Sequence, residues 1–164
     1  MLGIDPGTAT LGYGVVTGGA AHAASLVECG VVRTRAGESL SLRLAVIFDA
    51  LTELIGRHHP DVVAVEGLFH GKNARSALVL GHARGVVLLA VERAGLVVAE
   101  ISPAEVKRAV TGTGAASKSQ VGAMIARLLR LTQSPRPADA ADGVAIALTH
   151  LLRAEPRARV GFKR

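Results

Sequence analysis

The chain has 164 residues, of which 49% are hydrophobic, 20% charged and only 2% aromatic, and its formal net charge is +6. This composition excludes a disordered chain and favours one domain with a core of Leu, Val, Ile and Ala. The positive charge favours a polyanionic partner, nucleic acid first, although a high general use of arginine would give the same balance. The single cysteine, Cys29, excludes an internal disulfide.

The N-terminus and the apolar runs indicate a cytoplasmic protein with no membrane partner. Asp5 and the glycines around it interrupt any signal-peptide pattern. The longest apolar run, residues 86–91, is too short to span a membrane.

The first two thirds of the chain alternate between strand and helix patterns. Three strands with short glycine-rich links, typical of an antiparallel meander, are expected at residues 2–4, 11–17 and 26–34. An amphipathic helix, a strand, a long apolar helix and another strand follow at 40–58, 61–66, 74–94 and 96–101.

The last third is helical. Ser102 and Glu105 form a capping-box pattern around Pro103, so a short helix begins there and stops near Gly112. Further helices are expected from about residue 117 to 131 and from about 138 to 153. We expect residues 1–153 to form one nuclease-sized domain and the basic tail, residues 154–164, to be flexible.

This order of elements predicts an α/β fold with a mixed five-stranded sheet flanked by helices. Strands 1–3 are expected to be antiparallel, and strands 4 and 5 to run parallel to strand 1. Right-handed crossovers can then place the fourth strand beside the first. Asp5 and Glu66 would lie at the carboxyl ends of these two strands, where open α/β sheets bind their ligands.

The acidic residues allow a local and a functional interpretation. Asp-Pro-Gly at residues 5–7 could be only a turn. Asp139 and Asp142 share one face in the first turns of the last helix, where acids also favour the helix dipole. If these groups converge with Glu66, their repulsion would be relieved by Mg²⁺ or Mn²⁺, which take oxygen ligands.

Four segments in chain order resemble the RuvC family of Holliday-junction resolvases. They are IDPGT-x-x-x-GYGV, AVEGLFHGKNARSALVLGHARG, AEVKRAVTGTGAASKSQV and ADAADGVAIALTH. The resemblance extends to about residue 152 and implies an RNase H-like fold and a homodimer. It also implies symmetric, paired nicking of four-way DNA junctions with two Mg²⁺ ions per site, Mn²⁺ being able to substitute, in homologous recombination and DNA repair.

The resemblance also implies roles for individual residues. The catalytic, metal-binding acids correspond to Asp5, Glu66, Asp139 and Asp142. Phe69, the aromatic residue of the loop that follows Glu66, is expected by resemblance to stack on a DNA base near the cut, the alternative being an aromatic that folds back onto the core. Lys107 and Lys118 correspond to basic residues near the family's active site and are expected to contact phosphates near the cut, with Lys118 also stabilising charge during cleavage; the alternative for each is a solvated surface lysine. Lys72 and Arg75 follow Phe69 closely and could meet phosphates from their position alone.

Partners and rival functions complete the expectations. Ala77, Gly81 and Gly85 lie along one face of the helix at 74–94, so this helix could pack on the sheet or on a second copy of the chain. A RuvA–RuvB branch-migration complex is a further expected partner by resemblance. The alternatives are an actin-like or sugar-kinase ATPase, a junction-binding protein without activity, and another RNase H-like nuclease.

Overall fold

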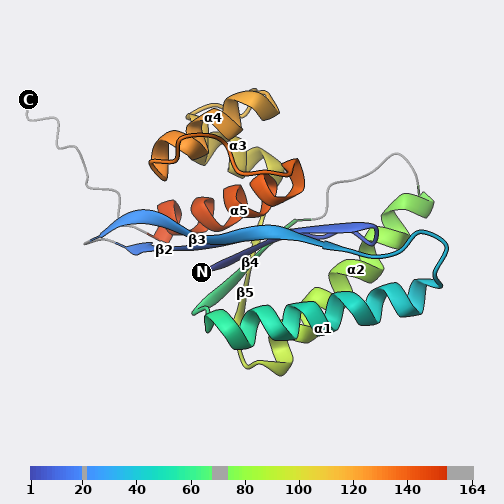
Figure 1. Ribbon diagram of the computed structural model, residues 1–164. Helices are drawn as coiled ribbons and strands as arrows, with labels where there is room; N and C mark the ends of the chain where they lie inside the picture. Colours follow the sequence, from blue (N-terminus) through green and yellow to red (C-terminus); the bar gives the residue numbers. More distant parts are fainter. Residues whose placement is uncertain (20–21, 68–73, 155–164) are drawn as a thin grey trace, which may run out of the picture.

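A five-stranded sheet lies between two layers of helices in the computed structural model, which describes residues 1–19, 22–67 and 74–154 (Figure 1). The strands lie side by side in the order β3-β2-β1-β4-β5. Their bounds are β1 (Leu2–Asp5), β2 (Thr10–Gly19), β3 (His22–Arg33), β4 (Val62–Glu66) and β5 (Val97–Ile101). β2 is antiparallel to β1 and β3, whereas β4 is parallel to β1 and β5. The predicted sheet is therefore confirmed.

The helices cover the two faces of the sheet unequally. One face carries α1 (Leu40–His58) and α2 (Ala74–Arg93). The other carries α5 (Ala138–Ala154), with α3 (Pro103–Thr111) and α4 (Lys118–Leu128) packed beyond it (Figure 1). Two separate apolar cores result, one on each side of the sheet.

Local signals explain where the helices begin and end. The Ser39 side chain caps the N-terminus of α1, and His59, in the left-handed conformation just before Pro60, ends it. The predicted capping box of Ser102 and Glu105 is present at the start of α3. A second capping box, formed by Ser117 and Gln120, starts α4 at Lys118.

Two predicted boundaries were wrong. The hairpin of β2 and β3 is longer than predicted, because β3 begins at His22 rather than residue 26. The small residues there have little strand preference of their own, and pairing with β2 supplies the missing stabilisation. Helix α4 ends at Leu128 rather than 131, because Arg130 adopts a positive φ of 54°.

Glycines let α5 approach the sheet closely. A Cβ atom added to Gly12 would clash with the Asp139 carbonyl oxygen, and one added to Gly14 would clash with the Val144 backbone. The two glycines occupy alternate positions of β2, so they line the same face of the strand. Bare backbone on this face brings the first turn of α5 against the end of β1.

Helix α2 is covered on one side only. Its buried side, including Val87 and Val91, packs on the sheet, while Leu78 and Leu89 are exposed. Within the described part of the chain, α2 alone has the length and apolar composition of a membrane-spanning helix. The core helices of soluble proteins can have the same length and composition, so these properties alone are weak evidence for a membrane span.

Candidate active site

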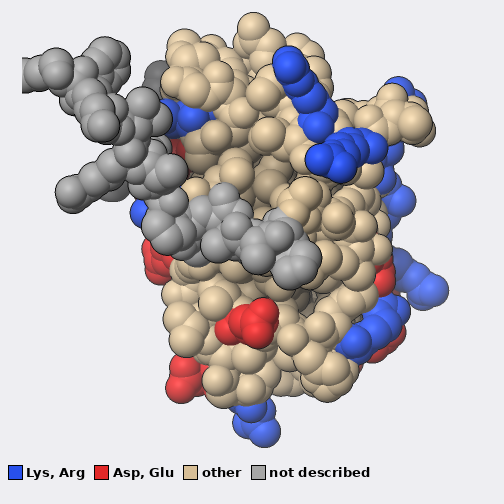
Figure 2. All heavy atoms as spheres, turned by 90° about the vertical axis from the view of Figure 1, so that its left-hand side faces the viewer, with Lys and Arg blue, Asp and Glu red and all other residues tan. Residues whose placement is uncertain are grey.

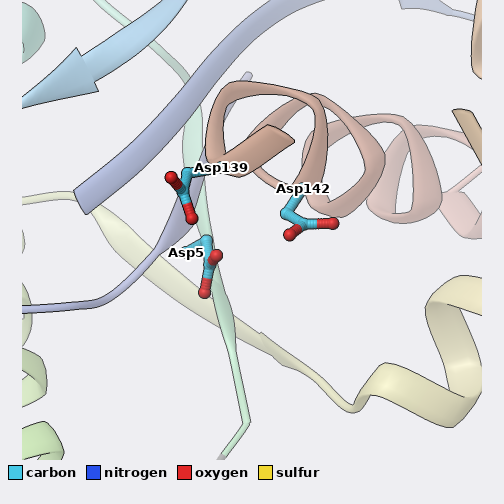
Figure 3. A group of neighbouring side chains, drawn as sticks. All are labelled: Asp5, Asp139 and Asp142. Atoms are coloured by element: carbon cyan, nitrogen blue, oxygen red, sulfur yellow. The ribbon is translucent and has the colours of Figure 1, made fainter. Parts of the chain in front are cut away.

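Three aspartates meet where β1 ends and α5 begins (Figure 3). Asp5 is the last residue of β1, and Asp139 and Asp142 lie on the first two turns of α5. One carboxylate oxygen from each lies within 4.8 Å of the other two. All three side chains are half-buried, so their charges repel one another in a partly desolvated place.

Glu66 joins this group from the neighbouring strand. The parallel register places Ile4 opposite Val65, so Asp5 and Glu66 follow at adjacent strand ends. Burial first, then the charges of Glu66 and Asp142, raise the pKa of Asp5 to about 7. Burial also raises the pKa of Glu66. Without bound cations, these two carboxyl groups therefore hold protons more readily than ordinary acids.

A lysine offsets part of the negative charge. Lys118 Nζ lies 2.9 Å from Asp142 Oδ2, and this hydrogen bond raises the pKa of the lysine. The cleft between α5, α3 and α4 is lined by Lys118 together with Asp5, Glu66, Asp142 and Lys107. The structure thus brings both lysines of the α3–α4 segment to the carboxylates.

Arg75 lies on the other side of the aspartates, at the start of α2. It lines a second groove together with Thr8, Thr10 and Asp139. Phe69 and Lys72, the other predicted DNA contacts, lie outside the described residues.

The acidic cluster fits a divalent metal site. Every candidate ligand is a carboxylate oxygen, the donor that hard cations such as Mg²⁺ and Mn²⁺ prefer. Burial, together with the neighbouring carboxylates, raises the pKa of Asp5 even though Lys118 pairs with Asp142, so a bound cation would favour the ionised form of Asp5. Asp5, Asp139, Asp142 and the adjacent Glu66 are the groups that would hold such ions.

The end of the molecule away from the carboxylates has scattered charge. Figure 2 shows this end, where α5 finishes: blue residues lie along the upper and right-hand rim and at the bottom, red ones lie at the lower left, at the lower centre and at the right, and uncharged ones fill the space between them. The visible part of this face therefore has no continuous basic band of the kind that a DNA backbone would need.

Sequence reasoning missed two features that build the site. The glycine alternation at residues 12 and 14 signals a close helix approach, because a strand interior seldom lacks side chains without reason. The S-x-x-Q pattern at Ser117 and Gln120 is a capping box, and it makes Lys118 the first residue of α4.

A mixed sheet with these strand directions, acidic groups at the ends of β1 and β4 and two more on the final helix defines an RNase H-like nuclease. The family model described as "Crossover junction endodeoxyribonuclease RuvC" matches residues 1–150. Proteins of that name from Moorella thermoacetica and Parafrankia sp. are 51% and 47% identical to this chain over 92% and 98% of its length, and over 89% and 90% of their own.

A solved structure agrees with these relatives. It is described as Thermus thermophilus RuvC in complex with a Holliday junction substrate, and it matches with a TM-score of 0.89 and 40% identity. The match covers 93% of each chain. The chain belongs to the RuvC family of crossover junction endodeoxyribonucleases.

Proposed function

We propose that this protein resolves four-way DNA junctions by paired, symmetric nicks in homologous recombination and DNA repair. The observation that carries the proposal is the meeting of Asp5, Asp139 and Asp142 beside Glu66 at one end of the sheet, in a chain of the RuvC family. The Thermus relative, whose structure contains a Holliday junction substrate, supports this choice of DNA.

Asp5, Glu66, Asp139 and Asp142 are proposed to hold two Mg²⁺ ions, with Mn²⁺ able to substitute. Bound divalent ions supply an activated water and stabilise the leaving oxygen in phosphodiester hydrolysis. The four carboxylates contribute the negative charge that favours cations at this site.

The basic residues and the loop after Glu66 are proposed to bind the DNA. Lys118, which pairs with Asp142 in the absence of DNA, stabilises negative charge that develops at the scissile phosphate. Lys107, from the same cleft, and Arg75, from the neighbouring groove, bind flanking phosphates. Lys72 joins them, and Phe69 stacks on a base near the cut.

The active form is proposed to be a homodimer that meets through α2. Leu78 and Leu89 are 64% and 52% exposed on this helix, and between them Gly81 and Gly85 border open space. A second α2 would cover this apolar strip, and a two-fold axis would match the near two-fold symmetry of a junction.

The cellular setting follows from the same proposal. The protein acts in the cytoplasm, and the RuvA–RuvB branch-migration complex is its expected partner. Residues 1–153 form the nuclease domain, and the basic residues at 154–164 add electrostatic attraction for DNA.

One cleavage assay tests the function against its rivals. A synthetic four-way junction, a linear duplex and an RNA–DNA hybrid are each incubated with Mg²⁺, Mn²⁺ or EDTA. We expect metal-dependent nicking of the junction alone, at symmetric positions. Equal cutting of the hybrid would favour another RNase H-like activity, and tight junction binding with no cutting would indicate a binding protein. ATP hydrolysis would favour the kinase-like alternative.

A further inference from the structure

Arg84 is a buried charged residue that the proposed chemistry does not use. It lies on α2 and is only 5% exposed. Its Nη1 group donates a hydrogen bond to the backbone carbonyl oxygen of Glu66, and its Nη2 group lies 2.6 Å from Glu100 Oε1 on β5. Burial of an arginine is costly unless its donors are satisfied, so these two contacts hold its side chain in place.

The sheet itself leaves the Glu66 carbonyl without a strand partner. The Gly67 amide donates to the Ile101 carbonyl. The N–H and C=O groups of residues 65 and 67 therefore point to β5, and those of Glu66 point to β1. Continuing the parallel register of Ile4 with Val65, the donor for Glu66 would be the amide of residue 6. Residue 6 is proline, which has no N–H.

Arg84 reaches this peptide from the opposite face of the sheet. Val87 and Val91 of the same helix pack with Val65, on the side away from α5. Ile101, opposite Glu66, packs on the α5 side, where the Glu66 carboxylate lines the acidic cleft. The guanidinium group therefore binds the backbone of Glu66 in the plane of the sheet, and the sheet separates it from the carboxylates.

We propose that Arg84 is a positioning residue for Glu66. By replacing the amide that Pro6 lacks, its guanidinium fixes the peptide between Glu66 and Gly67 and thereby the direction in which the Glu66 side chain leaves the strand. Glu100 serves as its counter-ion and holds its second arm. This inference rests on the proposed function of Glu66 as a metal ligand.

The test compares Arg84→Met with wild type in the full-length protein. Mn²⁺ binding is measured by electron paramagnetic resonance on the DNA-free protein, single-turnover cleavage at saturating junction, and junction binding by gel shift in EDTA. We expect Mn²⁺ affinity and the cleavage rate each to fall about 10–100-fold, the usual loss when a group that orients a metal ligand is removed. Junction binding in EDTA should stay within about twofold, because the phosphate-binding residues are untouched.

Matched variants separate positioning from folding. Arg93→Met makes the same change at an exposed site of α2 and should leave all three readouts unchanged. Arg84→Lys keeps the charge but has a single donor nitrogen in place of the two that Arg84 uses, and it should restore part of the Mn²⁺ affinity. If Arg84→Met does not fold, Arg84→Lys provides the test. Unchanged Mn²⁺ binding by a folded Arg84→Met would overturn the proposal. A wild type that binds Mn²⁺ but cuts no junction would instead refute the proposed function.

A double-mutant cycle locates the effect at the Glu66 carbonyl. Pro6→Ala supplies the missing amide, so Arg84→Met should cost Mn²⁺ affinity several-fold less in that background than in wild type. The same cost in both backgrounds would contradict an action through this carbonyl.

Discussion

At the residue scale, the acidic site lowers the stability of the metal-free protein, and the carboxyl group of Asp5 shows why. Its pKa is raised to about 7 by burial and by neighbouring carboxyl groups, whereas an exposed aspartate titrates near 4. The folded protein without metal thus carries a group that resists ionisation at neutral pH. The acidic residues that form the candidate cation site therefore lower the stability of the metal-free protein at neutral pH.

This raised pKa predicts a pH dependence of the metal-free protein. Because the folded pKa lies above the unfolded one, the stability associated with Asp5 is fully present below about pH 4 and is lost as pH rises through 7. We expect Asp5→Asn to be more stable than wild type in EDTA at pH 8, by on the order of a few kcal/mol. Thermal melts between pH 5 and 8 should show this gap widening with pH; a constant gap would contradict the assignment.

Single replacement of Asp5, Glu66, Asp139 or Asp142 by the matching amide tests the metal ligands. The amide keeps the shape but removes the charge, so single-turnover cleavage should fall at least about a hundredfold. Junction binding in EDTA should survive or tighten, since one repulsive charge is gone. Asp61→Asn, at an exposed position before β4, is the matched control. Near-wild-type cleavage by Asp5→Asn or Glu66→Gln would exclude the proposed site.

At the element scale, a polar cluster ties the end of α1 to the sheet. Glu28 of β3 accepts a hydrogen bond from the Tyr13 hydroxyl at 2.8 Å and pairs with Arg57 at 2.9 Å, and His58 Nε2 lies 2.8 Å from its other oxygen. The Tyr13 hydrogen bond is the main reason that the pKa of Glu28 is lowered. The cluster lies on the face opposite α5, so it supports the fold and not the site.

Glu28→Gln should therefore destabilise the protein in a pH-dependent way. A lowered pKa means that the ionised carboxylate stabilises the fold above its unfolded pKa and that this contribution is lost as pH falls. We expect a loss of about 1 kcal/mol at pH 7, since solvent weakens partly exposed pairs. The melting temperature should drop by about 2–4 °C, and the difference from wild type should shrink toward pH 4.

The control for this cluster lies one helical turn away. Glu53 also pairs with Arg57, at 3.5 Å, but its side chain is 73% exposed. Glu53→Gln should change the melting temperature by less than Glu28→Gln. Cleavage should be unaffected in both variants at temperatures where they are folded, and a specific loss of cleavage in Glu28→Gln would show that the cluster acts on the site.

At the scale of the whole molecule, the two faces of the sheet have different tasks. The α5 face brings the carboxylates together, and the opposite face carries α2 with its exposed apolar strip. Arg84 connects the two, because it starts from α2 and ends at the Glu66 peptide. Apart from Arg84, the exposed apolar strip of α2 and the carboxylates share no contact across the sheet among the interactions of the described residues, so changes at the proposed dimer surface and at the acidic site are separable by mutation.

Gly81→Leu should abolish the dimer without harming the monomer. A Cβ at Gly81 meets no atom within 4 Å, and replacing a helical glycine by leucine favours the helix by up to about 1 kcal/mol. Light scattering at micromolar concentration should show a dimer for wild type and a monomer for the variant, with paired nicking of the junction lost. Gly56→Leu on α1, also next to open space, should remain dimeric. A monomeric wild type would contradict the dimer.

The sequence alone determined most elements and the types of residue that matter. Helix α1 has the predicted bounds, and Ser102 and Glu105 cap α3 as predicted, because periodicity and capping depend only on residues a few positions apart. Local pairing also explains why the predicted hairpin was too short: the ends of β2 and β3 rely on each other and not on their own strand preference.

Only the tertiary structure decided which of these residues meet. Asp139 reaches Asp5 because two glycines of β2 leave room for α5, and Lys118 pairs with Asp142 across 24 positions of the chain. Arg84 satisfies a carbonyl that Pro6 leaves open, a need that exists only once β1 and β4 lie side by side. Local preferences act over one or two turns, whereas such encounters depend on strand order, register and close packing, which arise from the whole chain.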